Sequence, residues 1–205
     1  MAEKNKKDGI SRRNFLKGVG TGVVGGYLAP KVNALNKVLP AEINEYDERK
    51  VLLQFSVNGK KHRLEIFPSS TLAEVLRNDL ELMGTKIVCN QGECGGCTVL
   101  LDKKAVYSCH MLAVEAEGKE VTTIEGLGDG NDLHPVQQAF VDHDGLQCGF
   151  CTPGQIMAAE ALLIEKPKPT RDEVLDAMSG NICRCSAYPK IIDSVLAAAE
   201  KNAKS

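Results

Sequence analysis

The chain has 205 residues, of which 43% are hydrophobic and only 4% aromatic, and its formal net charge is −2. This length predicts one or two domains, and the near-neutral charge argues against nucleic acid as a partner. Cysteine is the unusual residue, because all eight cysteines lie between residues 89 and 185. They form two groups of four, the number of thiolates that zinc and iron–sulfur sites commonly use.

Residues 1–34 are predicted to be a twin-arginine export signal. A lysine-rich start is followed by Ser11-Arg12-Arg13-Asn14-Phe15-Leu16-Lys17, which resembles that signal. The mild apolar run at 18–29 is shorter than the roughly 20 residues that span a membrane. We expect cleavage after Ala34 and a periplasmic protein that is not integral to the membrane, exported already folded with its cofactors. The alternative is a basic amphipathic tail.

Residues 35–49 are polar and are predicted to be a linker, followed by a small α+β domain over 50–125. Alternating apolar residues predict a strand at 51–57, and Asn58-Gly59 predicts a hairpin turn into a return strand that ends before Pro68. Thr71 and Glu74 form a capping box that starts a helix running to about Asp79. Further short strands are expected at 98–101, 105–108 and 121–124.

A glycine-rich segment at 126–132 predicts a domain boundary, and the pattern beyond it is helical. Helices are expected to begin at Pro135 and Pro153, after a second capping box at Thr170, and at Pro189. Residues 133–200 are therefore predicted to form a small helical domain.

The first cysteine group has the spacing Cys89-x4-Cys94-x2-Cys97, the spacing of plant-type [2Fe–2S] ferredoxins, with Cys109 as the fourth residue. A loop that wraps a cluster needs tight turns and positive φ angles, which the glycines at 92, 95 and 96 supply. Zinc would favour two short cysteine pairs, and this group contains only one. Because four cysteines are available, we do not expect His110 to be a ligand.

The second group consists of Cys148 and Cys151, just before a predicted helix start, and Cys183 and Cys185 after another helix. Helix N-termini suit an anionic cluster because their free N–H groups and dipole favour negative charge. A disulfide between Cys183 and Cys185 is disfavoured by their closeness, which favours a metal. Arg184 is expected to face solvent, although a charge that tunes the cluster is the alternative.

Three segments together resemble the iron–sulfur small subunits of the xanthine oxidase, or molybdenum hydroxylase, family. They are Cys89-Asn90-Gln91-Gly92-Glu93-Cys94-Gly95-Gly96-Cys97-Thr98-Val99, Gln147-Cys148-Gly149-Phe150-Cys151-Thr152-Pro153-Gly154 and Gly180-Asn181-Ile182-Cys183-Arg184-Cys185. With the export signal, the chain is most similar to the subunit of a periplasmic aldehyde oxidoreductase. The departures from the family pattern are Val88, Lys103-Lys104 and Ser186-Ala187-Tyr188.

The resemblance implies a β-grasp [2Fe–2S] ferredoxin domain followed by a four-helix [2Fe–2S]-binding domain. It implies a large partner subunit with molybdopterin of the cytosine dinucleotide type and a second partner with FAD. Electrons would pass from the pterin, near Gln147 and Cys185, through both clusters to FAD or another acceptor, while substrate chemistry stays on the partner and this chain has no catalytic residue. The alternatives are a disulfide-stabilised exported binding domain and a two-zinc structural module.

Overall fold

The computed structural model describes residues 49–128, 130 and 132–202. The predicted export signal at 1–34 and all but the last residue of the predicted linker at 35–49 lie outside the described residues. Within the described part of the chain, no helix combines the length and the apolar character that crossing a membrane requires.

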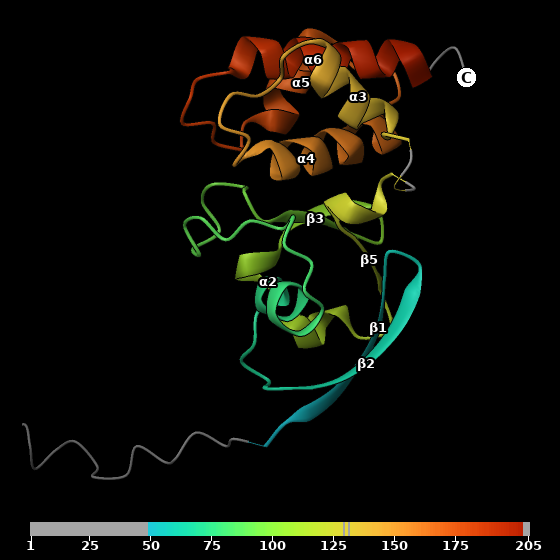
Figure 1. Ribbon diagram of the computed structural model, residues 1–205, viewed down its shortest axis with the longest axis vertical. Helices are drawn as coiled ribbons and strands as arrows, with labels where there is room; N and C mark the ends of the chain where they lie inside the picture. The colour runs from blue at the N-terminus through green and yellow to red at the C-terminus, as the bar shows by residue number, and fades with distance from the viewer. Residues whose placement is uncertain (1–48, 129, 131, 203–205) are drawn as a thin grey trace, which may run out of the picture. The chain divides into compact units, whose positions relative to one another are not determined.

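The first half of the described chain forms a five-stranded mixed sheet with the strand order β2-β1-β5-β3-β4 (Figure 1). The strands are β1 (Val51–Val57), β2 (Lys60–Ile66), β3 (Thr98–Leu101), β4 (Lys104–Tyr107) and β5 (Glu120–Thr122). β1 and β5 run parallel, whereas the pairs β1–β2, β3–β4 and β3–β5 are antiparallel. This sheet confirms the predicted ferredoxin-like α+β architecture.

Both hairpins of the sheet close with two-residue turns whose residues have positive φ. Between β1 and β2 these are Asn58 (φ 51°) and Gly59 (φ 74°), the pair that the sequence predicts. Between β3 and β4 they are Asp102 (φ 47°) and Lys103 (φ 68°). Turns of this kind favour glycine at the second position, so Lys103 occupies a backbone conformation that suits it poorly.

The helix predicted after Thr71 forms, but its second half is wider than an α-helix. The capping box of Thr71 and Glu74 starts α2 (Leu72–Glu74), and a π-helical turn continues it from Val75 to Asp79. There the Leu80 N–H donates to the Val75 carbonyl, five residues back. The buried Leu72 and Leu76 pack in one cluster with the inward-facing residues of β1, which completes the core of this domain.

The last strand is shorter than the sequence predicts. β5 ends at Thr122, and a 3₁₀ turn occupies Ile124–Gly126. The Thr123 N–H donates to the side chain of Asn58 instead of a neighbouring strand, which ends the ladder at Thr122. Two further 3₁₀ turns lie at Ser108–His110 and Ala113–Ala116.

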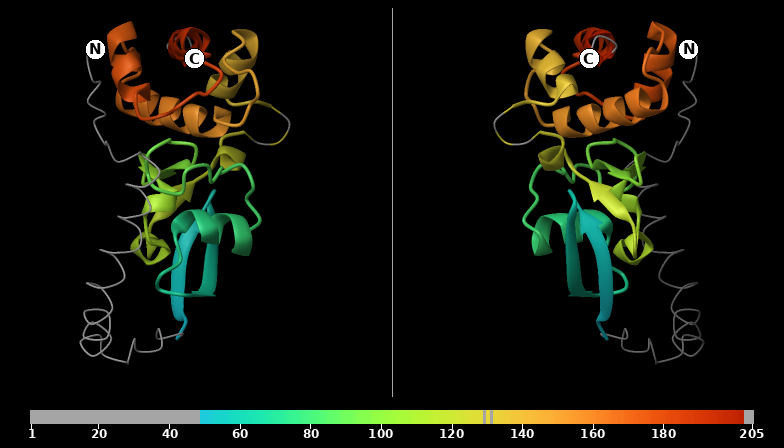
Figure 2. Two further views of the ribbon diagram at one scale, coloured as in Figure 1. Left: turned by 90° about the vertical axis from the view of Figure 1, so that its left-hand side faces the viewer. Right: turned by 90° about the vertical axis from the view of Figure 1, so that its right-hand side faces the viewer.

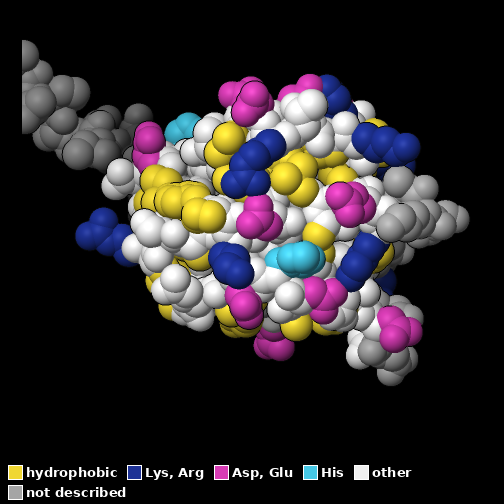
Figure 3. All heavy atoms as spheres, turned by 90° about the horizontal axis from the view of Figure 1, so that it is seen from above, with side chains coloured by type: hydrophobic (Ala, Val, Ile, Leu, Met, Phe, Trp, Pro, Cys, Tyr) yellow, Lys and Arg dark blue, Asp and Glu magenta, His cyan; other side chains and the backbone are white. Residues whose placement is uncertain are grey.

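The second half of the described chain consists of four helices, as predicted. They are α3 (Pro135–Asp142), α4 (Thr152–Glu165), α5 (Arg171–Met178) and α6 (Tyr188–Asn202). Their apolar faces enclose one core that includes Phe140, Ile156, Val174 and Ile191. Seen from the side of α3, α5 and α6, the surface carries charges of both signs among scattered apolar side chains (Figure 3).

Helix α4 packs on the sheet domain along β3 and β4 (Figures 1 and 2). Gly154, in its first turn, makes the approach possible, because a Cβ there would lie 3.1 Å from the Gly96 carbonyl oxygen and closer still to that of Gly95. The helical domain therefore rests on the loop that carries the first cysteine group.

Candidate metal centres

The first cysteine group comes together around the loop that precedes β3. Cys89, Cys94 and Cys97 lie on this loop, and Cys109 arrives from the 3₁₀ turn after β4. The four thiols meet in two pairs, because the side chain of Cys94 hydrogen-bonds to Cys89 and that of Cys109 to Cys97. The Cys109 N–H also lies 3.4 Å from the Cys97 sulfur.

The loop turns through left-handed backbone conformations at Asn90 (φ 54°), Gly92 (φ 77°) and Gly95 (φ 67°). These turns bring the Gln91 N–H to 3.4 Å from the Cys89 sulfur. The prediction of positive φ thus holds for Gly92 and Gly95 but not for Gly96. Gly96 has a different requirement, since a Cβ there would lie 2.8 Å from the Val88 side chain.

The second group lies at the starts of two helices. Cys148 and Cys151 precede α4, with Cys151 as its N-cap, and Cys183 and Cys185 lie between α5 and the start of α6. These thiols also meet in two pairs, with Cys148 beside Cys185 and Cys151 beside Cys183. Two helix N-termini therefore approach one set of thiols, an arrangement that favours negative charge there.

Each group contains a thiol whose pKa is lowered and one whose pKa is raised, Cys97 being buried and Cys151 half-buried. Hydrogen bonds from the backbone N–H groups of Gln91 and Glu93 lower the pKa of Cys89 to about 7, and the Phe150 N–H lowers the pKa of Cys148. Burial raises the pKa of Cys97 and of Cys151 to about 12. A metal must displace the protons of these two thiols, because thiolate is the ligand form.

The pairing of the thiols fits a two-iron cluster better than a single ion. Among the described residues, no three or more His, Cys, Asp or Glu side chains converge closely enough to hold one metal ion. Structural zinc needs four ligands around one point, whereas a [2Fe–2S] cluster spreads four thiolates over two irons. All eight cysteines are free thiols in the structure. The donor set therefore fits two [2Fe–2S] clusters.

The other residues singled out from the sequence lie at the surface. Gln147, Arg184 and His110 are exposed, and Gln147 immediately precedes the exposed Cys148. At the departure from the family pattern after Cys185, Ser186 takes the positive φ of 59°, and the hydroxyl of Tyr188 accepts a hydrogen bond from the Cys183 N–H.

Sequence reasoning missed a set of buried polar residues between the two cysteine groups. Asn181 is 4% exposed and Gln155 1%, and the half-buried Tyr107 hydrogen-bonds to the Gly180 carbonyl. One signal was present: Gln155 lies directly before the apolar run that begins at Ile156, and it is polar where the helix buries most of its residues.

A ferredoxin-like sheet domain and a helical domain, each with four converging cysteines, define a two-domain iron–sulfur protein. The family described as "2Fe-2S iron-sulfur cluster binding domain" matches residues 55–124, and that described as "[2Fe-2S] binding domain" matches residues 123–196. The chain is 45% identical over 158 residues to the aldehyde oxidoreductase iron-sulfur-binding subunit PaoA of Escherichia coli K12, covering 70% of this chain and 69% of the relative.

Other relatives agree with this class. The nicotine 6-hydroxylase small subunit of Paenarthrobacter nicotinovorans is 46% identical over 147 residues, covering 72% of this chain and 88% of its own. The crystal structure of quinoline 2-oxidoreductase from Pseudomonas putida 86 has 44% identity and a TM-score of 0.73, covering 77% of this chain and 98% of that one. The chain belongs to the iron–sulfur small subunits of the aldehyde oxidoreductase and xanthine dehydrogenase family, which confirms the resemblance, and it is an oxidoreductase subunit.

Proposed function

We propose that this chain is the electron-transfer subunit of a molybdenum hydroxylase and holds one [2Fe–2S] cluster in each domain. The observation that carries the proposal is the arrangement of the eight thiols as two sets of two pairs. In the sheet domain the ligands are Cys89, Cys94, Cys97 and Cys109, and in the helical domain Cys148, Cys151, Cys183 and Cys185. Each cluster, when bound, supplies a carrier for one electron.

We infer that the second set faces the large molybdopterin subunit, with Gln147 and Cys185 toward the pterin. Cys148 is exposed, whereas Cys97, Cys109 and Cys183 are buried. Exposed apolar side chains flank the second set on both of its segments: Leu146, Phe150, Ile182 and Tyr188. Apolar groups beside a redox site are typical of a surface that a partner covers. FAD on a further subunit, or another acceptor, would then take electrons from the first set.

Iron analysis and thiol chemistry test the cluster assignment. Chain purified without oxygen should contain about four irons, as two [2Fe–2S] clusters require, and its thiols should label only after denaturation with a chelator. Labelling that requires a reductant would instead identify the disulfide-stabilised exported domain, and zinc in place of iron would identify the structural module.

Substitution at the proposed docking surface tests the partner. Phe150→Asp should abolish co-purification of the molybdopterin subunit without loss of iron, because the new charge would be buried in the interface. Val141→Asp, at a side chain of similar exposure on α3, is the matched control and should have no effect. Retention of the large subunit by the Phe150 variant would place the interface elsewhere.

We further propose export to the periplasm by the twin-arginine route, supported by the sequence pattern around Arg12 and Arg13. Replacing both arginines by lysine should leave the cluster-loaded chain in the cytoplasm. Periplasmic recovery of that variant would contradict the proposal.

A further inference from the structure

The strand β4 forms an open edge of the sheet. In the part of the chain that the structure describes, β4 pairs with β3 alone, and no strand lies on its other side. Ser108, directly after β4, donates its N–H inward to the Cys97 carbonyl, and inward and outward groups alternate along an antiparallel ladder. The N–H and C=O groups of Ala105 and Tyr107 therefore point away from β3. Such an edge is a template for another extended chain.

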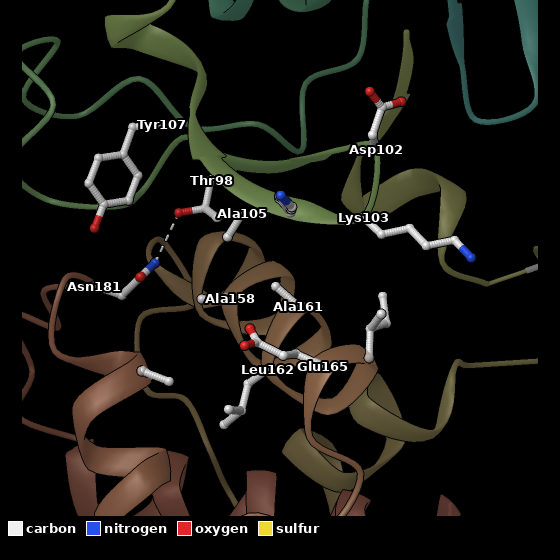
Figure 4. Close-up of a pocket in the computed structure, with 13 residues that line it drawn as sticks. Thr98, Asp102, Lys103, Ala105, Tyr107, Ala158, Ala161, Leu162, Glu165 and Asn181 are labelled. Atoms are coloured by element: carbon white, nitrogen blue, oxygen red, sulfur yellow. Dashed lines mark hydrogen bonds between the residues drawn. The ribbon is translucent and has the colours of Figure 1, made fainter.

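A groove of about 820 Å³ lies beside this edge, between the β3–β4 hairpin and α4. Its lining includes the short side chains of Ala105 on β4, Ala158 and Ala161 on α4, and Ala177 on α5. Figure 4 shows Ala105 and the two alanines of α4 on facing sides of the groove. Because side chains alternate between the faces of a strand, an extended chain beside β4 would direct every second side chain into the groove. The short lining leaves room there for large apolar side chains.

The hairpin end of the groove is positively charged. Lys103 and Lys104 lie at this end, and Glu165 lines the groove from α4. The carboxylate of Asp102, which also lines the groove, accepts a hydrogen bond at 3.1 Å from the Glu120 N–H and is thereby held toward β5. The two lysines thus outweigh the remaining carboxylate, which favours acidic side chains on a chain that lies along β4.

Lys103 holds its charge in an unfavourable backbone conformation. Its φ is 68°, at a turn position that favours glycine. Strained residues of this kind concentrate at binding and active sites. Lysines on an edge strand also serve to prevent pairing with other chains. Here they occupy only the turn and the first position of the strand, and no other described residue covers the outward groups of Ala105 and Tyr107.

We propose that the β4 edge and its groove bind an extended segment of a partner chain, which adds to the sheet beside β4. The segment carries large apolar side chains at alternate positions and acidic residues next to Lys103 and Lys104. Antiparallel pairing, the more stable arrangement, places the acidic residues at its C-terminal end, because β4 starts at Lys104. The β4 strand of a second copy begins with lysine and has no acidic residue, so it lacks the complementary charge. The proposal does not depend on the assignment of the cysteines as cluster ligands.

Two synthetic peptides probe the edge in the full-length chain. The first is acetyl-Leu-Thr-Leu-Thr-Asp-Asp-amide, and the second has asparagine in place of both aspartates. Fluorescence anisotropy of the labelled peptides measures their dissociation constants. Hydrogen–deuterium exchange, resolved to single amides by mass spectrometry, reports which N–H groups a peptide covers.

We expect the aspartate peptide to bind and to protect the N–H groups of Ala105 and Tyr107. The Val106 N–H bonds to β3 and should be protected with or without the peptide. The asparagine peptide should bind about fivefold more weakly, the effect of losing exposed ion pairs.

Ala105→Pro tests the backbone pairing, and Lys61→Pro is the matched control. Each position is the second residue of an edge strand that follows a two-residue turn. In both strands the N–H at this position points outward, so proline spares the hairpin ladder. Ala105→Pro should weaken binding of the aspartate peptide about tenfold, because it removes a donor to the peptide and adds a ring at the edge. Lys61→Pro should change binding by less than about twofold on the same basis.

Lys104→Glu and Lys60→Glu, each at the first residue of its strand, test the charge and remain informative if Ala105→Pro does not fold. Lys104→Glu should weaken the aspartate peptide about fivefold and the asparagine peptide much less, whereas Lys60→Glu should affect neither. Failure of the aspartate peptide to bind, or equal weakening by the β2 and β4 variants, would overturn the proposal. Protection of Ala105 and Tyr107 by dimerisation of the chain alone would also overturn it, because a second copy would then be the occupant.

Discussion

Replacing Gly154 by alanine tests whether α4 presses on the loop of the first cysteine group. A Cβ at this position would lie 3.1 Å from the Gly96 carbonyl oxygen and 3.2 Å from the Gly95 carbonyl carbon, with the Gly95 oxygen closer still. These are backbone atoms in a loop that the thiols also hold, so they cannot rotate away as a side chain would. The helix and the loop must therefore separate.

Two opposing effects determine how much Gly154→Ala changes the free energy of unfolding. Overpacking typically costs about 1–3 kcal/mol, and the rigid backbone favours the upper end of this range. Alanine in place of glycine inside a helix contributes about 1 kcal/mol of stability in return. We therefore expect Gly154→Ala to lower the free energy of unfolding by about 1–2 kcal/mol, the difference between the cost of overpacking and the gain in helix propensity.

Urea denaturation of the cluster-loaded chain, followed by the loss of cluster absorbance and by far-UV circular dichroism, measures this change. A Gly154 variant at least as stable as the parent would show that the gain in helix propensity outweighs any overpacking and that α4 does not press on the loop.

Three further substitutions probe features away from the centres. Lys103→Gly should raise the free energy of unfolding by about 1 kcal/mol in urea melts, because it relieves a left-handed conformation in a turn that favours glycine; an unchanged midpoint would contradict this. Glu160 lies 3.6 Å from His134, and burial raises the pKa of its carboxyl. Ionising this carboxyl in the folded protein is therefore unfavourable, and the protein loses stability as pH rises above 4.5, the ordinary pKa of a glutamate. Glu160→Gln should therefore add about 1 kcal/mol at alkaline pH and nothing in acid, and equal effects at both pH values would refute this. Hydrogen bonds from Lys166 and the capping box lower the pKa of Glu173 to about 2. The ionised Glu173 therefore contributes to stability above pH 4.5, and this contribution is lost as pH falls toward 2. A carboxyl NMR titration of Glu173 should show that low midpoint, and Lys166→Met should move it upward.

Local chemistry made much of the fold predictable. The Asn58-Gly59 turn, the capping boxes at Thr71 and Thr170 and the helix start at Pro135 depend on contacts within a few residues, and each lies where the sequence places it. The π-helical turn after Val75 and the early end of β5 were not predictable in this way. The π-helical turn depends on the path of the segment that follows it. The end of β5 depends on the Asn58 side chain, which is distant in sequence.

In the candidate centres, too, the local features were predictable and the long-range contacts were not. Spacing alone suggested which cysteines belong together, because ligand spacing is a local property of a loop or of a helix start. The contacts between the two groups were not visible, because Asn181 meets Gly95 across 86 residues of sequence. Gln155 could have been noticed as a polar residue in an apolar helix, but its partner could not have been named.

The position of Gly154 has a consequence for how the chain assembles. The first turn of α4 follows Cys151 of the second group and at the same time rests against the backbone at Gly95 of the first. A change in the course of the first loop would therefore displace the first turn of α4 and, with it, Cys151, so the two sets of thiols are not arranged independently.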